Sequence, residues 1–143
     1  MNRITVFFMF ALLLSVWSCS KKKIFQLGQS VELKMQEGAS CTDCKSSLSV
    51  EFLDIMEDSR CPKNTTCIWA GKAVVKLRVN TSKQQIFDLT INGDSKQGNT
   101  KVVGDYSITF ESLSPYPESG VQAKKTEKVL KVLVQKNRNR GKV

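Results

Sequence analysis

Histidine is absent from this chain of 143 residues, and its absence excludes several chemistries. A Ser-His-Asp or Cys-His nucleophile pair, a histidine general base and a histidine metal ligand are all impossible. An enzyme with this composition would depend on Asp, Glu, Lys, Tyr or Cys alone. The sequence therefore predicts a protein without catalytic activity, without a cofactor and without a bound metal.

The sequence also lacks a hydrophobic run long enough to cross a membrane. Its main apolar stretch, residues 4–16, would span about 20 Å as a helix, whereas a spanning helix needs about 20 residues. Arg3 precedes this stretch and the small Ser18 follows it, which is typical of an export signal. We expect residues 1–18 to be a signal peptide. The alternatives are an uncleaved anchor and ordinary secretory cleavage after Ser18.

The end of this segment, Val16-Trp17-Ser18-Cys19, resembles the lipobox of bacterial lipoprotein precursors. In that family an aliphatic residue and two small residues precede a cysteine that is lipidated. Trp17 departs from the pattern, because its position is small or aliphatic there. The resemblance implies a lipid on Cys19 that attaches the protein to a membrane. Ser20 is similar to the residue found in lipoproteins of the outer membrane, so we expect that location, facing the periplasm or the exterior.

The cysteine count agrees with a lipid on Cys19, because Cys41, Cys44, Cys61 and Cys67 can then form two disulfides with none left over. Export also favours disulfides. Four cysteines allow three pairings, and adjacency favours 41–44 with 61–67. The C-x-x-C at 41–44 leaves thiol–disulfide exchange open as an alternative. The wide spacing of the second pair disfavours zinc.

Basic residues exceed acidic ones, with a net charge of +9 that becomes +8 when Arg3 leaves with the signal peptide. Such a charge favours anionic partners. We expect residues 19–24 to be a basic tether, in which Lys21, Lys22 and Lys23 contact anionic lipid at about 1 kcal/mol each. An anionic envelope polymer is a further candidate partner. Nucleic acid is not expected outside a membrane. Residues 137–143 read as a basic flexible tail.

The mature chain shows no sustained helical period but many short alternations of apolar and polar residues, which are typical of strands. They cover residues 31–36, 48–55, 73–79, 87–91, 106–111 and 130–135, with residues 101–103 as a candidate seventh. The alternation changes phase at Phe52-Leu53, which predicts a β-bulge. We therefore expect an all-β fold, an antiparallel β-sandwich (Ig-like or similar) of about six to seven strands over residues 25–136.

The most distinctive stretch runs from Asp58 to Gly71 and reads D-S-R-C-P-K-N-T-T-C-I-W-A-G. Pro62 begins a turn, and a bridge between Cys61 and Cys67 would stabilise the fold by roughly 2–2.5 kcal/mol. We expect Trp69 to pack into the core against that bridge and Gly71 to admit a neighbouring segment. We expect Asp58 and Arg60 to form an exposed ion pair worth about 0–1 kcal/mol. The stretch is thus predicted to be a structural corner.

This stretch resembles a D-S-R-C-P-x4-C-x-W-A-G motif found in small exported bacterial proteins, many of them lipoproteins of the Bacteroidetes type. The likeness extends to Ser114-Pro115-Tyr116-Pro117 and to a last strand ending at Lys136, about residues 25–136 in all. It implies location and shape, because no activity is assigned to that family. Tyr116, between two prolines, is either a recognition residue or a side chain tucked inward.

These observations predict a lipid-anchored cell-envelope module that binds a partner or has a structural role. Two alternatives remain open at this point. One is an inhibitor of an extracytoplasmic enzyme. The other is a thiol–disulfide redox protein that uses Cys41 and Cys44.

Overall fold

The computed structural model describes residues 23–93, 98–121 and 123–137. The predicted signal peptide (residues 1–18), the lipidation site Cys19, the tether lysines Lys21 and Lys22, and residues 138–143 of the tail lie outside these ranges. The described elements are β1 (Lys23–Phe25), β2 (Ser30–Lys34), β3 (Gly38–Cys41), β4 (Ser49–Asp58), β5 (Lys72–Asn80), β6 (Gln84–Asn92), β7 (Thr100–Val103), β8 (Tyr106–Ser114), the short 3-10 helix η1 (Lys125–Glu127) and β9 (Val129–Lys136).

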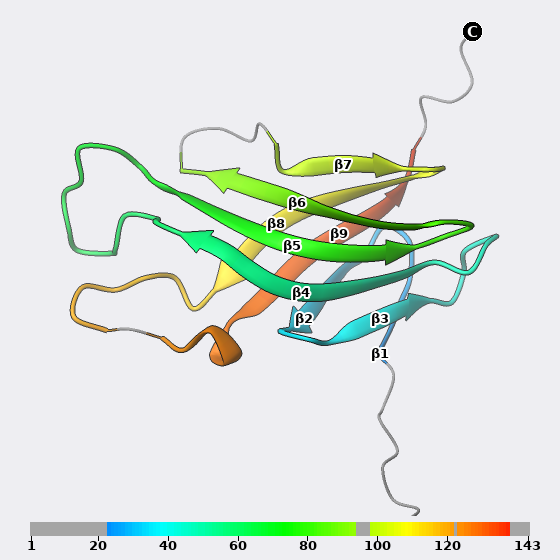
Figure 1. Ribbon diagram of the computed structural model, residues 1–143, viewed down its shortest axis with the longest axis horizontal. Coiled ribbons are helices and arrows are strands. Elements are labelled where there is room, and N and C mark those ends of the chain that lie inside the picture. The colour runs from blue at the N-terminus through cyan, green and yellow to red at the C-terminus, as the bar shows by residue number, and fades with distance from the viewer. Residues whose placement is uncertain (1–22, 94–97, 122, 138–143) are drawn as a thin grey trace, which may run out of the picture.

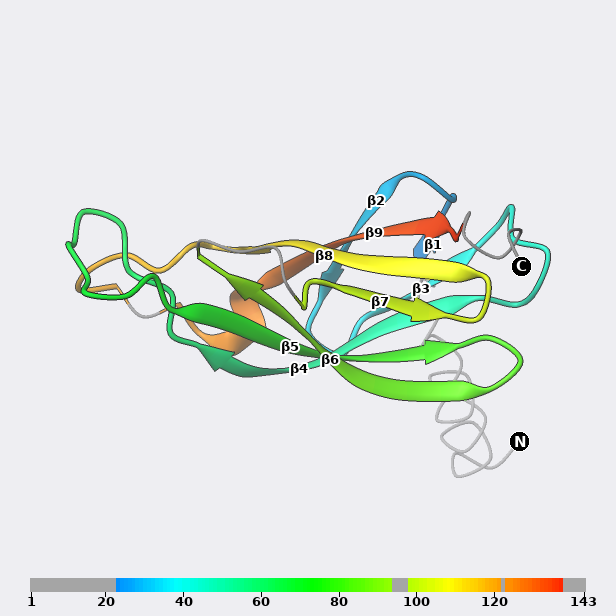
Figure 2. The same ribbon diagram turned by 90° about the horizontal axis from the view of Figure 1, so that it is seen from above.

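The strands form two sheets packed face to face, which confirms the predicted all-β sandwich (Figures 1 and 2). One sheet has the order β1-β3-β4-β5-β6 and the other the order β2-β9-β8-β7. All neighbouring strands run antiparallel except β1 and β3, which are parallel. Among the described residues, no helix is long and apolar enough to pass through a bilayer.

The core lies between the sheets because each long strand turns alternate side chains inward. In β5 and β9 the buried residues are the alternating apolar ones. The largest fully buried side chains come from both sheets and include Phe52, Leu77, Leu89, Ile108 and Phe110. Strand β4 is irregular between Phe52 and Asp54, which confirms the predicted bulge, and again between Ile55 and Glu57.

The structure has two strands, β1 and β3, that the alternation did not indicate. Both are short, and β3 reads Gly-Ala-Ser-Cys, which has too few apolar side chains to show a period. Because β1 begins at Lys23, the last two residues of the predicted tether belong to the sheet. The ammonium of Lys23 lies 3.2 Å from Glu37 Oε2 and also donates to the carbonyl of Glu32. Lys23 is therefore engaged within the domain.

Two loops extend from one end of the sandwich, opposite the hairpin that joins β5 to β6 (Figures 1 and 2). The first, residues 59–71, connects β4 to β5. The second, residues 115–121, follows β8. We call these two segments together the double-loop lobe.

Candidate binding site on the double-loop lobe

The two loops of the lobe are joined to each other. The backbone N–H of Lys63 donates to the carbonyl of Pro117 at 2.9 Å, and Lys63 forms an isolated β-bridge with Glu118. Their side chains also face each other, with Lys63 Nζ 3.8 Å from Glu118 Oε1. The loops are therefore joined into one unit although 43 residues, 72–114, separate them in the chain.

The first loop is closed by a disulfide between Cys61 and Cys67, as predicted. At its base the N–H of Cys61 donates to the carbonyl of Ala70 at 3.1 Å. Gly71 then adopts a positive φ of 68°, and a Cβ at this position would lie 1.8 Å from the carbonyl oxygen of Ser59. Only glycine accommodates both conditions, so the base of the loop is tightly constrained.

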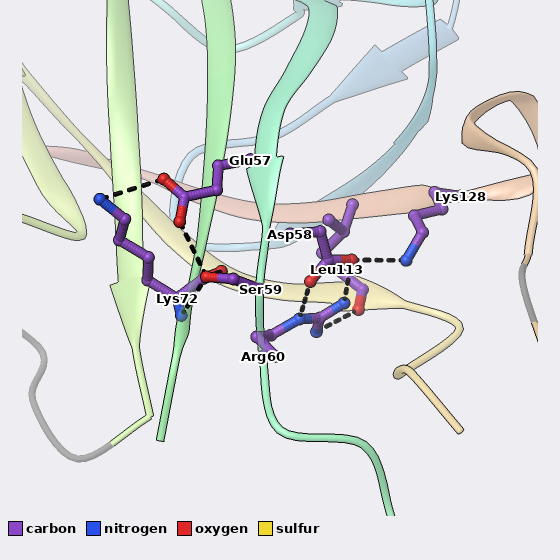
Figure 3. Close-up of polar contacts among 7 residues, drawn as sticks. All are labelled: Glu57, Asp58, Ser59, Arg60, Lys72, Leu113 and Lys128. Atoms are coloured by element: carbon purple, nitrogen blue, oxygen red, sulfur yellow. Dashed lines mark hydrogen bonds and ion pairs between the residues drawn. The ribbon is translucent and has the colours of Figure 1, made fainter. Parts of the chain in front are cut away.

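A buried charge cluster anchors the lobe to the sandwich (Figure 3). The Arg60 guanidinium donates twice to the Asp58 carboxylate, at 2.6 and 2.9 Å, and once to the Leu113 carbonyl at 2.8 Å. Lys128 Nζ donates to the same carboxylate at 2.5 Å. The cluster therefore joins the end of β4, the end of β8 and the residue before β9.

The expectation of an exposed Asp58–Arg60 pair is wrong, because their side chains are only 11% and 6% exposed. Burial by itself raises the pKa of Asp58, but the hydrogen bonds from Arg60 and Lys128 outweigh it and hold that pKa below the usual value. The neighbouring Glu57 differs, because it is a surface residue that binds Ser59 and Lys72 (Figure 3). Ser59 and Lys72 lower its pKa as well.

Tyr116 lies on the Arg60 side chain. The guanidinium carbon is 4.6 Å from the centre of the Tyr116 ring, within the range of a cation–π contact. The residue is 40% exposed, so Tyr116 is fixed in position on Arg60 yet still accessible to a partner. The two interpretations offered for Tyr116, recognition and packing, are therefore compatible.

The predicted burial of Trp69 is also wrong, because this residue is 72% exposed and its neighbour Ile68 is 96% exposed. Neither residue belongs to a strand, since β5 begins only at Lys72. The buried side chain of this corner is instead Arg60. Four of the exposed large hydrophobic residues of the described chain lie on the lobe, namely Ile68, Trp69, Tyr116 and Val121. The sequence did not predict this exposed group of apolar side chains.

The second predicted disulfide, Cys41–Cys44, forms far from the lobe and joins the last residue of β3 to the loop that follows it. Asp43 Oδ1 accepts a hydrogen bond from the N–H of Leu27 at 3.0 Å, which fastens this loop to the segment after β1. Cys41, Asp43 and Cys44 are close enough to suggest a metal site, but the disulfide removes the two thiolates that would bind it. The pair does not open a helix as it does in thioredoxin-like proteins.

The described residues form several concave sites. A cavity of about 240 Å³ lies beside the lobe between Arg60, Phe110 and Tyr116, below the usual 300–1,000 Å³ of small-molecule pockets. A groove of about 610 Å³ runs along the β2–β3 turn and β4. Its carboxylates Glu37 and Glu51 are already paired with Lys23 and Arg78. The lobe, which carries four exposed large hydrophobic residues, is therefore the better candidate.

No protein-family model, curated protein or solved structure matches this chain. The lobe combines four exposed large hydrophobic residues with a disulfide-closed loop and a buried charge cluster at its base.

Proposed function

We propose that the protein is an exported, lipid-anchored module of the cell envelope that binds a macromolecular partner through the double-loop lobe and has no catalytic activity. The observation that carries this proposal is the exposure of Ile68 and Trp69 on a loop whose base is closed by a disulfide and by the Cys61–Ala70 backbone hydrogen bond. Large aromatic side chains dominate binding energy at protein interfaces. A preorganised loop loses little conformational entropy on binding, which raises affinity.

The position of the lobe supports its display away from the anchor. Lys23 pairs with Ala39, and Ala39 pairs with Val50, so Lys23 lies level with the start of β4. The lobe begins after Asp58 at the other end of that strand, roughly 25 Å further along at about 3.3 Å per residue. Cys19 precedes Lys23 by four residues, which span at most about 14 Å. A lipid on Cys19 would therefore leave the lobe accessible to a partner.

Lipid anchoring at Cys19 predicts the mass of the native protein. Protein extracted from its native membrane is expected to begin at Cys19, to carry acyl chains on that residue and to contain two disulfides and no metal. Intact-mass spectrometry before and after reduction and alkylation measures all of these together. The Cys19→Ser variant is expected to leave the membrane fraction. A native protein that begins elsewhere, or that carries no acyl mass, would contradict lipid anchoring.

The lobe predicts a position-specific contact. A photo-crosslinking amino acid at Ile68 in producing cells is expected to give a discrete adduct in the envelope fraction. The same amino acid at Met56, an exposed hydrophobic residue of β4 outside the lobe, serves as the control and should give none. The Ile68 adduct should fall at least several-fold when Trp69 is replaced by serine. Equal labelling from both positions would argue against a lobe-specific partner.

The disulfide-closed loop, which extends from one end of the sandwich (Figure 1), also favours a second candidate, an inhibitor that inserts the lobe into the cleft of an extracytoplasmic enzyme. In that case the purified domain should lower the activity of the crosslinked partner, and the Trp69→Ser variant should not. The thiol–disulfide alternative remains a separate prediction, which requires insulin-reduction activity that is lost in Cys41→Ser.

A further inference from the structure

The two sheets have four edge strands, and these differ in how well they are protected from pairing with other chains. The edges are β1 and β6 in one sheet and β2 and β7 in the other. Three are short, with three, five and four residues for β1, β2 and β7. β2 also exposes the charged Glu32 and Lys34. Short and charged edges resist unwanted strand addition.

Strand β6 has none of these protections. It is nine residues long and reads Q-Q-I-F-D-L-T-I-N, with no lysine, arginine, proline or glycine and with Asp88 as its one charge. Its pairing with β5 is regular, without a bulge that would twist the edge away. Ile86 is 51% exposed on this strand. A long, regularly paired and nearly uncharged edge is a template for another strand.

One hydrogen bond shows which backbone groups of β6 point away from β5. The N–H of Thr90 donates to the carbonyl of Gly98 at 3.0 Å, so the backbone of Thr90 points away from β5. Backbone direction alternates along an antiparallel strand. The N–H and C=O groups of Gln84, Ile86 and Asp88 therefore point outward as well, and their side chains are exposed. This outward segment, residues 84–88, is the available edge.

We propose that β6 pairs antiparallel with β6 of a second copy of the chain, centred on Ile86. In this register Ile86 lies opposite its own copy, and Gln84 lies opposite Asp88 of the other copy. No like charges face each other, and each carboxylate meets an amide donor. The outward groups of all three residues then find partners, and the sheet becomes continuous across both copies.

The charge of the chain sets the conditions for this pairing. Each mature copy carries +8, so two copies repel one another, whereas the edge itself carries only Asp88. Salt screens charges that are more than about 8 Å apart at physiological ionic strength. The dimer is therefore expected to tighten as salt is raised, which is the opposite of a contact held by ion pairs. This inference does not depend on the proposed role of the lobe.

Sedimentation velocity of the mature chain, residues 19–143 with Cys19→Ser, tests the pairing over a range of protein and salt concentrations. We expect a reversible dimer. Ile86→Lys should weaken it at least tenfold, because two ammonium groups would meet at the centre. Met56→Lys, a matched change at an exposed residue of β4, should leave it unchanged. A chain that stays monomeric at every condition overturns the proposal, as does an Ile86→Lys variant that dimerises like the parent.

A cysteine scan tests the register. Hydrogen-bonded antiparallel partners have Cα atoms about 5.5 Å apart, within the range of a disulfide. Ile86→Cys should therefore form a crosslinked dimer on mild oxidation, seen on a non-reducing gel. Gln84→Cys faces the same side but lies several residues from its copy, and should not crosslink. Equal crosslinking at both positions would contradict the Ile86-centred pairing.

Discussion

Replacing Asp58 with alanine is expected to destabilise the protein by about 3–5 kcal/mol, because it leaves two buried cations without their shared carboxylate. Arg60 would keep one hydrogen bond, to the Leu113 carbonyl, and its contact with the Tyr116 ring, whereas Lys128 would lose its carboxylate partner. Domains of this size are stable by only about 5–15 kcal/mol. Urea unfolding followed by circular dichroism measures the loss, with Asp58→Asn as a milder variant that preserves side-chain shape.

The neighbouring Glu57 provides the matched control. It also binds a lysine, Lys72, but both side chains are well exposed, and exposed ion pairs contribute little. Glu57→Ala should therefore leave the unfolding midpoint close to that of the parent. If the two alanine variants were equally stable, burial of the Asp58 cluster would not matter and the role assigned to it would be wrong.

The same cluster predicts the response to acid. The pKa of Asp58 is lowered in the folded protein, so the carboxylate stabilises the fold fully above its unfolded pKa of about 3.9. That contribution is lost as the pH falls through the lower folded value. The difference in stability between the parent and Asp58→Asn should therefore shrink below about pH 4. A difference that grows in acid would contradict this sign.

The second large effect is expected from Gly71→Ala. The new Cβ would overlap the Ser59 carbonyl oxygen in a backbone conformation that L-residues avoid, so we expect a loss of at least about 3 kcal/mol. Gly104→Ala separates the two causes, because Gly104 has a φ of 59° but no atom within 4 Å of its Cβ position. That variant should lose only about 1 kcal/mol. Thermal unfolding of both proteins measures the difference.

The sandwich could be predicted from sequence because its long strands bury one face each. Alternation in β5 and β9 is nearly unbroken, and the change of phase at Phe52 located a real bulge. Strands β1 and β3 escaped notice because three or four residues are too few to show a period. Both are held by their neighbours in the sheet, and such pairing has no local signature.

The chemistry of the corner was harder to predict for a related reason. Asp58 and Arg60 looked like surface charges because their partners, Leu113 and Lys128, lie 53 and 70 residues away in the chain. Trp69 was expected in the core because large aromatic side chains are usually buried. It lies instead on the loop, three residues before β5 begins, and its side chain is exposed. Spacing identified the disulfide, whereas only the tertiary contacts reveal which side chain the corner buries.

The disulfide-closed loop has a consequence for attack by proteases. Lys63 lies between Cys61 and Cys67, so a trypsin-like enzyme that cuts after Lys63 produces two fragments that remain covalently joined. The fragment that begins at Asn64 also stays in place, because its strands β5 to β9 belong to the two sheets. A nicked molecule would therefore run as an intact chain on a non-reducing gel and separate only after reduction, and it would keep its sandwich assembled.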